Sequence, residues 1–194
     1  MKKKYFNYFR YLNIFLIGPT GSGKTFIGKM LSFYLGKIFF DLDELVSLSV
    51  KMKINEIFSK KKEKFFRKKE EEISCKTIKS NKGFILSFGA GSISSINITN
   101  LLNYGLVIYL KSNIKTQINR LIYKKNRPLI KNFNNYKKSK KLKKILLKMS
   151  KTRNFIYKKF SDIEVITDDK NFLEVINDII FKILNIIKRL NVKG

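Results

Sequence analysis

The sequence predicts an α/β fold, a single domain in which a five-stranded parallel sheet is flanked by helices. Short apolar runs of four to six residues alternate with longer segments that have helical periodicity. A glycine-rich loop directly follows the first of these runs. The 194 residues show no internal repeat and no clean domain boundary, and one domain of this length buries a sizeable core.

The first elements are predicted from local patterns. A strand is expected over residues 13–17, where four apolar residues follow an asparagine. The glycine-rich loop occupies residues 18–25, and a helical pattern continues from it to about Leu35. A second short strand at residues 37–40 ends in the acidic sequence of residues 41–43. This alternation is typical of a parallel sheet that helices cover on both faces.

The rest of the chain continues the alternation. Strands are predicted at residues 83–88, 106–110 and 163–166, and helices at residues 44–51, 55–59, 63–80, 94–103, 114–123, 139–160 and 171–190. Residues 124–138 are rich in Lys and Asn and contain Pro128, which predicts a mobile surface lid. The folded domain is therefore expected to span residues 13–190, after a basic N-terminal extension formed by residues 1–12.

The composition excludes several kinds of chemistry. The chain has no His, which removes the Ser-His-Asp triad, acid–base catalysis by imidazole and the usual zinc sites. Cys75 is its only cysteine, so no intrachain disulfide forms and a reducing compartment, the cytoplasm, is expected. No apolar run is long enough to span a bilayer, and residues 1–10 are not followed by the apolar core of a signal peptide. No membrane partner is therefore expected.

The charge is strongly positive, with 42 Lys and Arg against 14 Asp and Glu and a formal net charge of +28. Such a charge attracts polyanions, either nucleic acid or an anionic membrane surface. A biased composition is the other interpretation, because Lys, Asn, Ile, Phe and Tyr dominate everywhere and the lysines are spread along the chain. The second interpretation is favoured, and no specific nucleic-acid partner is expected.

Carboxylates are scarce, which narrows where a metal ion or a general base can be held. None lies between Glu72 and Asp162, so the third predicted strand, residues 83–88, ends without an acid. Asp41 and Asp43, at the end of the second strand, are the well-placed alternatives. Asp43 also suits the N-cap of the following helix, which is compatible with a functional role.

Residues 18–25 match the phosphate-binding pattern G-x-x-x-x-G-K-[ST] between a strand and a helix, which makes the fold a P-loop NTPase-type domain. Glycines let backbone N–H groups curl around phosphates, and the helix N-terminus adds partial positive charge. Lys24 is expected to reach the β- and γ-phosphates, and the Thr25 hydroxyl to bind Mg²⁺. A glycine turn with a surface lysine is the alternative. The expected nucleotide-binding residues of this loop are Gly18, Pro19, Thr20, Gly21, Ser22, Gly23, Lys24 and Thr25.

Three arginines are candidates for binding anions. Arg153 falls within the apolar stripe of the predicted helix 139–160 with no acid nearby in sequence, so a bound anion is a candidate partner. Arg67 precedes Glu70 by three residues, and Glu70 is a candidate to hold its guanidinium for a bidentate grip on a carboxylate. Arg127 lies in the predicted lid, from which it would meet phosphates on closure. Extension of Arg153 to solvent and a surface ion pair for Arg67 are the alternatives.

Taken together, these segments resemble the shikimate kinase family, small P-loop kinases related in fold to the nucleoside monophosphate kinases. They occur in the family's order and nearly its spacing, from residue 13 to about residue 184. The matching segments are residues 13–25, Phe40 to Asp43, Phe66-Arg67 with Glu70-Glu71, Leu86 to Gly91, Arg127-Pro128-Leu129, Arg153-Asn154 and Thr167-Asp168. The resemblance implies transfer of the γ-phosphoryl group of ATP to the 3-hydroxyl of shikimate with Mg²⁺, giving shikimate 3-phosphate for chorismate and aromatic amino-acid biosynthesis.

The resemblance also implies roles on the acceptor side of the reaction. Asp43 corresponds to the residue that binds the substrate hydroxyls and is the candidate base. Arg67 and Arg153 correspond to the arginines that grip the shikimate carboxylate. The glycine-rich substrate loop corresponds to Gly89, Ala90 and Gly91.

On the donor side, the resemblance implies that Lys24 and Arg127 neutralise charge on the phosphoryl oxygens. Asp41 would hold Mg²⁺ through water, with Thr25 as the other metal-binding residue, and Arg120 corresponds to a residue beside the adenine. A monomer that takes the small-molecule substrate shikimate is expected. The expected catalytic residues are Asp43, Lys24 and Arg127.

Ala90 departs from the family, whose substrate loop usually has three glycines in a row. Its Cβ is added where the backbone is expected to need a positive φ, so Ala90 is expected to weaken shikimate binding. Three other functions remain open. A gluconate-type sugar-acid kinase shares the phosphate loop and the size, a nucleic-acid-binding P-loop protein would use the charge, and a degenerate kinase would keep only the fold.

Overall fold

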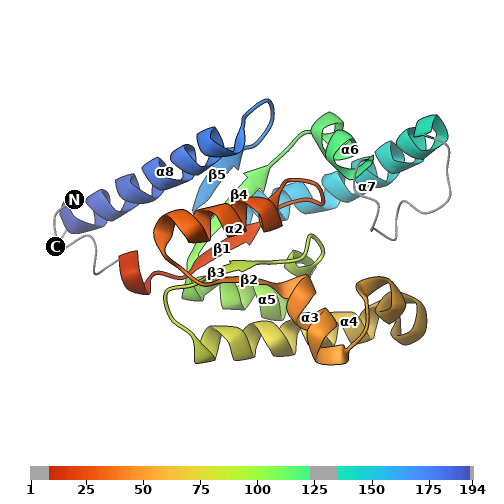
Figure 1. Ribbon diagram of the computed structural model, residues 1–194, viewed down its shortest axis with the longest axis horizontal. Coiled ribbons are helices and arrows are strands. Elements are labelled where there is room, and N and C mark those ends of the chain that lie inside the picture. Colours follow the sequence, from red (N-terminus) through yellow and green to blue (C-terminus); the bar gives the residue numbers. More distant parts are fainter. Residues whose placement is uncertain (1–8, 123–134, 193–194) are drawn as a thin grey trace.

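Five short parallel strands form the centre of the molecule in a computed structural model that describes residues 9–122 and 135–192 (Figure 1). The strands are β1 (Ile14–Ile17), β2 (Phe39–Asp41), β3 (Ile85–Ser87), β4 (Leu106–Lys111) and β5 (Ile163–Ile166). Their order in the sheet is β2-β3-β1-β4-β5, and every neighbouring pair is parallel. The predicted α/β fold with a five-stranded parallel sheet is therefore confirmed.

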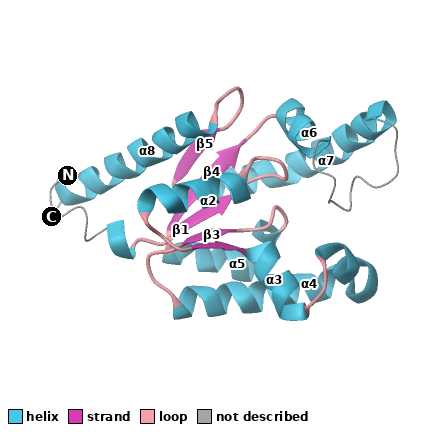
Figure 2. Ribbon diagram, viewed as in Figure 1, coloured by secondary structure: helices cyan, strands magenta, loops and turns pink. Residues whose placement is uncertain are grey.

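Helices cover both faces of the sheet (Figure 2). They are α2 (Lys24–Leu35), α3 (Leu42–Val50), α4 (Ile54–Ser80), α5 (Ile96–Leu101), α6 (Ile114–Ile122), α7 (Asn135–Phe160) and α8 (Phe172–Val192). None of the helices among the described residues is long and apolar enough to cross a membrane.

Strand β1 shows why both faces need a cover, because all four of its side chains are buried. Phe15 and Ile17 point into one core, which α3, α4, α5 and Tyr157 of α7 complete. Ile14 and Leu16 point into the other core, which α2 and α8 complete. A strand that is apolar on both faces fits only the middle of a helix-covered parallel sheet, and β1 occupies the central position.

The helices predicted at residues 55–59 and 63–80 are present as the two parts of α4, which meet at Lys62, where φ is 68°, ψ is 163° and the backbone is not helical. One predicted helical segment has a different form in the structure. The helix predicted at residues 94–103 is broken into a 3₁₀ turn, α5 and a second 3₁₀ turn, residues 102–104. Most of the predicted lid lies outside the described residues, and its last four residues belong to α7.

Candidate functional site

The loop between β1 and α2 has the backbone of an anion-binding turn. Gly18, Gly21 and Gly23 have φ values of 144°, 86° and 97°, which side chains of L residues rarely allow. A Cβ on Gly18 would also lie only 2.5 Å from the carbonyl oxygen of Leu110. The glycines therefore allow both the turn and its close packing on β4, and helix α2 starts directly after the loop.

Lys24 and Thr25, the first residues of α2, turn their polar groups toward the loop and β2. Lys24 Nζ donates to the carbonyl oxygens of Gly18 at 2.7 Å and Pro19 at 3.0 Å. Thr25 Oγ1 donates to Asp41 Oδ2 at 2.7 Å, and Asp41 Oδ1 accepts a 3.1 Å hydrogen bond from the backbone N–H of Asp43. The sheet order brings these groups together, because β2 and β1 both pair with β3.

The pair Thr25 and Asp41 fits Mg²⁺, because hydroxyl and carboxylate oxygens are the ligands that this ion prefers. Within residues 9–122 and 135–192, no three Asp, Glu, Cys or His side chains gather into a metal cluster. An ion held here therefore takes most of its ligands from phosphates and water, which is usual for Mg²⁺ in phosphoryl-transfer sites.

A cavity of about 560 Å³ lies over the phosphate loop, within the size range of small-molecule sites. At one end it is lined by Asp43, Gly89 and Ala90, and at the other by Arg120 and Phe172. The cavity lies outside the carboxyl ends of the parallel strands, where open α/β sheets bind their ligands.

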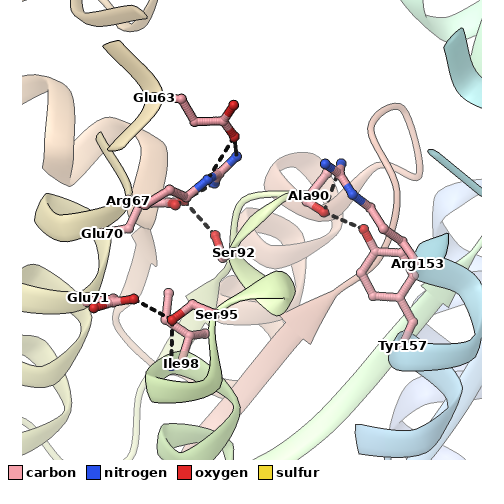
Figure 3. Close-up of polar contacts among 10 residues, drawn as sticks. All are labelled: Glu63, Arg67, Glu70, Glu71, Ala90, Ser92, Ser95, Ile98, Arg153 and Tyr157. Carbon is pink, nitrogen blue, oxygen red and sulfur yellow. Dashed lines mark hydrogen bonds and ion pairs between the residues drawn. The ribbon is translucent and has the colours of Figure 1, made fainter. Parts of the chain in front are cut away.

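Arg67 on α4 is fixed by two carboxylates. Its Nη1 donates to Glu70 Oε2 at 2.5 Å, and its Nη2 to Glu63 Oε1 at 3.0 Å. Glu70 is fully buried and also accepts a 2.5 Å hydrogen bond from Ser92 Oγ (Figure 3). This geometry matches the prediction that Glu70 holds the guanidinium of Arg67, and the exposed Glu63 forms the surface ion pair of the alternative interpretation.

Burial and the ion pair act in opposite directions on Arg67 and Glu70. Desolvation raises the pKa of Glu70, although the charge of Arg67 and the hydrogen bond from Ser92 act in the opposite direction. For Arg67, burial alone lowers the pKa, but Glu70 and Glu63 more than reverse this and raise it. Arg67 therefore carries its full charge while its guanidinium is held by two protein carboxylates.

The loop after β3 passes very close to the polar side chains of the site. A Cβ on Gly89 would lie 2.9 Å from Asp43 Oδ1, and one on Gly91 would lie 2.2 Å from Arg67 Nη2. Glycine is needed at both positions because of this close approach and not because of a positive φ. The predicted need for a positive φ at Ala90 is wrong, because Ala90 is not among the described residues with that conformation.

Arg153 on α7 lies on the other side of the same loop. Its Nη1 is 3.4 Å from the carbonyl oxygen of Ala90, and the hydroxyl of Tyr157 donates to that oxygen at 2.5 Å. In Figure 3 the side chains of Arg67 and Arg153 extend toward each other from α4 and α7, on either side of the loop. Arg153 thus faces the loop, as its place in the apolar stripe predicts.

Arg120 on α6 connects the phosphate loop to the end of β5. Its Nη1 donates to the carbonyl oxygens of Gly21 at 3.3 Å and Ser22 at 3.2 Å, and its Nη2 to the carbonyl oxygen of Thr167 at 2.7 Å. Arg127 lies outside the described residues. Arg120 and most of the predicted nucleotide-binding residues of the phosphate loop line the same cavity. The exceptions are Gly18 and Pro19, whose carbonyl oxygens accept hydrogen bonds from Lys24.

Sequence reasoning missed three residues that support the site. Ser92 binds Glu70, Tyr157 binds Ala90, and Thr167 accepts from Arg120 Nη1 at 3.0 Å. Tyr157 was predictable only as part of the apolar stripe, four residues after Arg153, and nothing in that pattern indicates where its hydroxyl points. Ser92 and Thr167 adjoin predicted site segments, and this proximity is the only signal that the sequence offers.

Comparisons with known proteins agree with this geometry. A family model described as shikimate kinase matches residues 20–184. A shikimate kinase of Blochmanniella floridana is 39% identical over 170 residues, which are 86% of this chain and 90% of the relative. A shikimate kinase of Actinobacillus pleuropneumoniae serotype 5b is 37% identical over 175 residues, 90% of this chain and 96% of the relative.

Among solved structures, a shikimate kinase and a gluconokinase resemble this chain to different degrees. The shikimate kinase of Acinetobacter baumannii in complex with shikimate has a TM-score of 0.81 and 30% identity, covering 93% of this chain and 97% of that one. A gluconokinase of Sinorhizobium meliloti has a TM-score of 0.57 and covers 95% of this chain and 98% of that one. Its identity is 11%, so this second likeness concerns the fold alone.

Proposed function

The chain belongs to the shikimate kinase family, and from this premise we propose that its site transfers the γ-phosphoryl group of ATP to the 3-hydroxyl of shikimate. The products are shikimate 3-phosphate and ADP. The observation that carries the proposal is the placement of two guanidinium groups, those of Arg67 and Arg153, on either side of the loop that borders Asp43. Such a pair is suited to a ring that carries a carboxylate beside hydroxyl groups.

On the acceptor side, Arg67 and Arg153 bind the carboxylate of shikimate. Arg67 keeps part of its planar donor set for this contact, because Glu63 takes one N–H each of Nε and Nη2 and Glu70 takes one of Nη1. Of the five N–H donors, one on each Nη is left for the ligand. Arg153 exchanges its long 3.4 Å contact with Ala90 for the ligand. Asp43, in the wall of the cavity, binds the hydroxyl that reacts.

On the donor side, the N–H groups of the phosphate loop hold the phosphates, and Lys24 moves from the carbonyl oxygens of Gly18 and Pro19 to the β- and γ-phosphates. Arg120 and Phe172 border the part of the cavity where the base lies. Arg127, in the predicted lid of residues 124–138, stays a predicted phosphate-binding residue. The kinase domain is proposed to span residues 13–190, after the N-terminal extension of residues 1–12.

The chemical step is a displacement at phosphorus. The Asp43 carboxylate accepts the proton of the 3-hydroxyl, and the hydroxyl oxygen forms a bond to the γ-phosphorus. The bond between that phosphorus and the β–γ bridging oxygen breaks, and its electron pair stays on ADP. Thr25 and, through water, Asp41 would hold Mg²⁺, which would supply positive charge beside the phosphate oxygens. The remaining catalysis comes from positioning and from the charge of Lys24.

The direct test is a coupled assay of ADP release with and without shikimate. We expect ADP release that requires shikimate and Mg²⁺, and little stimulation by gluconate, whose open chain does not match two guanidinium groups held on either side of one loop. ADP release that gluconate stimulates and shikimate does not would replace this proposal with the sugar-acid kinase. RNA binding that falls steeply with salt, together with no shikimate-dependent turnover, would replace it with the nucleic-acid-binding function.

We also propose that the enzyme acts as a monomer in the cytoplasm. The residues of one chain supply groups for the phosphates, the metal ion and the acceptor, so the proposed reaction requires no residue from a second copy. Both proposed substrates are small molecules. Light scattering during size-exclusion chromatography measures the mass of the active species. A mass near 22.8 kDa supports the monomer, and twice that mass contradicts it.

A further inference from the structure

Tyr157 on α7 is a buried residue whose polar group reaches the substrate loop. Its side chain is 1% exposed and its ring stacks on Tyr109 of β4, with ring centroids 5.2 Å apart and an interplanar angle of 28°. Its hydroxyl donates to the carbonyl oxygen of Ala90 at 2.5 Å, across 67 residues of sequence. A buried ring fixed by stacking places that hydroxyl with little freedom.

The hydroxyl is a permanent donor. Burial raises the pKa of Tyr157 above its usual range, and the nearby charge of Arg153 lowers it by less. The phenol therefore stays protonated at all physiological pH values. The carbonyl oxygen of Ala90 in turn has only acceptor capacity, so the direction of this hydrogen bond is fixed.

The same carbonyl oxygen is also the acceptor for Arg153, and the two contacts are unequal. Tyr157 makes the 2.5 Å bond, whereas Arg153 Nη1 stays at 3.4 Å, the long end of the hydrogen-bond range. Because Tyr157 satisfies the carbonyl, Arg153 is not required to do so. Apart from a hydrogen bond with the side chain of Tyr157, its guanidinium therefore keeps its donors for a ligand.

The other side of the loop is fixed independently by α4. Ser92 donates to the buried Glu70, and Ser95 and Asn97 both donate to Glu71. Figure 3 shows the loop between these α4 contacts and the Tyr157 contact from α7. Loss of the Tyr157 bond would leave the α7 side of the loop to Arg153 alone.

We propose that Tyr157 is a positioning residue for shikimate, which holds the Ala90 carbonyl so that Arg153 is released to bind the substrate carboxylate. This inference rests on the proposed function and deepens it. The contact is made to a main-chain carbonyl, which a residue of any type at position 90 would supply.

Tyr157→Phe tests the inference, since it keeps the stacked ring and removes only the hydroxyl. We expect the KM for shikimate to rise about 3- to 10-fold, which is the range of one neutral hydrogen bond. The KM for ATP should stay within about twofold, and kcat within about threefold, because neither Lys24 nor Asp43 depends on Tyr157. Thermal unfolding of the variant checks that it is folded.

Two further variants separate positioning from general stability. Tyr109→Phe removes the hydroxyl of the partner ring, which has no hydrogen bond to any residue within the described part of the chain, and should leave the KM for shikimate unchanged. In an Arg153→Ala background, Tyr157→Phe should no longer raise that KM, because the two residues act through one contact. An undiminished effect in that background overturns the inference.

The outcomes distinguish the inference from the proposed function. A wild-type enzyme without shikimate-dependent ADP release overturns the proposed function, and the inference with it. An active wild type with an unchanged KM for shikimate in Tyr157→Phe overturns the inference alone, whether or not the melting temperature falls. Equal rises in the KM values for shikimate and ATP indicate a structural role and also overturn it.

Discussion

Two lysines at opposite ends of helix α2 make the same kind of contact with different consequences. Lys24 begins the helix and donates to the carbonyl oxygens of Gly18 and Pro19, six and five residues earlier in the chain. Lys37 follows the helix and donates to the carbonyl oxygens of Phe9 at 2.7 Å and Leu12 at 2.9 Å. Both ammonium groups therefore bind main-chain carbonyls.

The difference lies in where the partners come from. The carbonyls at Lys24 belong to its own loop, so phosphates can replace them without separating distant parts of the chain. Lys37 is only 9% exposed and joins the N-terminal segment to the start of β2, with Gly83 before β3 as a further 3.3 Å partner. The cation at the carboxyl ends of the strands, Lys24, can therefore exchange its partners, whereas the cation near their amino ends, Lys37, is structural.

The largest expected effect at the carboxyl edge comes from Asp43→Asn. The variant keeps the shape and the backbone N–H that Asp41 binds, but it loses the group that accepts the proton. We expect kcat to fall about 10²- to 10⁴-fold, the range of general base catalysis, with an unchanged melting temperature. Turnover near the wild-type value in the coupled ADP assay would refute the role of Asp43 as base.

Lys24→Met should have the second-largest effect on activity. Its removal takes one preorganised cation from the developing charge on the phosphates, so we expect kcat/KM for ATP to fall about 10²- to 10³-fold. The melting temperature should change little, because the carbonyls of Gly18 and Pro19 belong to the loop next to Lys24, and these bonds join no distant parts of the chain. A large loss of stability with modest loss of activity would show that the two lysines are alike.

Lys37→Met is the opposite variant, with an effect on stability alone. Several buried carbonyl oxygens lose their donor, so we expect about 1–3 kcal/mol of destabilisation, measured by urea unfolding, and kinetic constants close to wild type. The comparison fails if Lys37→Met lowers kcat/KM by more than its loss of folded protein explains. Lys29→Met, on the exposed side of α2, is the matched control.

The pH dependence of stability gives a second test of the structural role of Lys37. Burial lowers its pKa from 10.5 to about 8, so between these values the unfolded chain binds a proton that the folded chain lacks. The free energy of unfolding should therefore rise with pH across this window, and the neutral amine still has two hydrogens for Phe9 and Leu12. Lys37→Met should lack this rise in the free energy of unfolding. An identical pH profile of stability in the wild type and the variant would contradict the lowered pKa of Lys37.

The same contrast explains what the sequence predicts and what it does not. The strands, the helices and the phosphate loop are local patterns, and each is recognisable within about twenty residues. The inward face of Arg153 follows from helical periodicity alone. The partners of Lys37 lie 25 to 46 residues away, and the hydroxyl of Tyr157 meets Ala90 across 67 residues, so no local pattern contains them.

The backbone of Ala90 was also beyond local prediction, because the residue names in the substrate loop do not state its φ angles. The Ala90 carbonyl is held by the hydrogen bond from Tyr157, which is a tertiary contact. The break in α4 is the opposite case, because the helices predicted from local patterns at residues 55–59 and 63–80 meet at Lys62, where the backbone is not helical.

Ala90→Gly carries the smallest expected effect and tests whether the substrate loop is fixed by distant contacts, like Lys37, or by its own glycines. Because Ala90 does not have a positive φ, its Cβ imposes no backbone strain, and glycine mainly adds freedom to the unfolded chain. We expect about 0.4–1 kcal/mol lower stability by urea unfolding and a KM for shikimate within about twofold of wild type. A KM that falls more than threefold would mean that the methyl group obstructs the substrate, and that the hydrogen bond from Tyr157 does not by itself determine the shape of the loop.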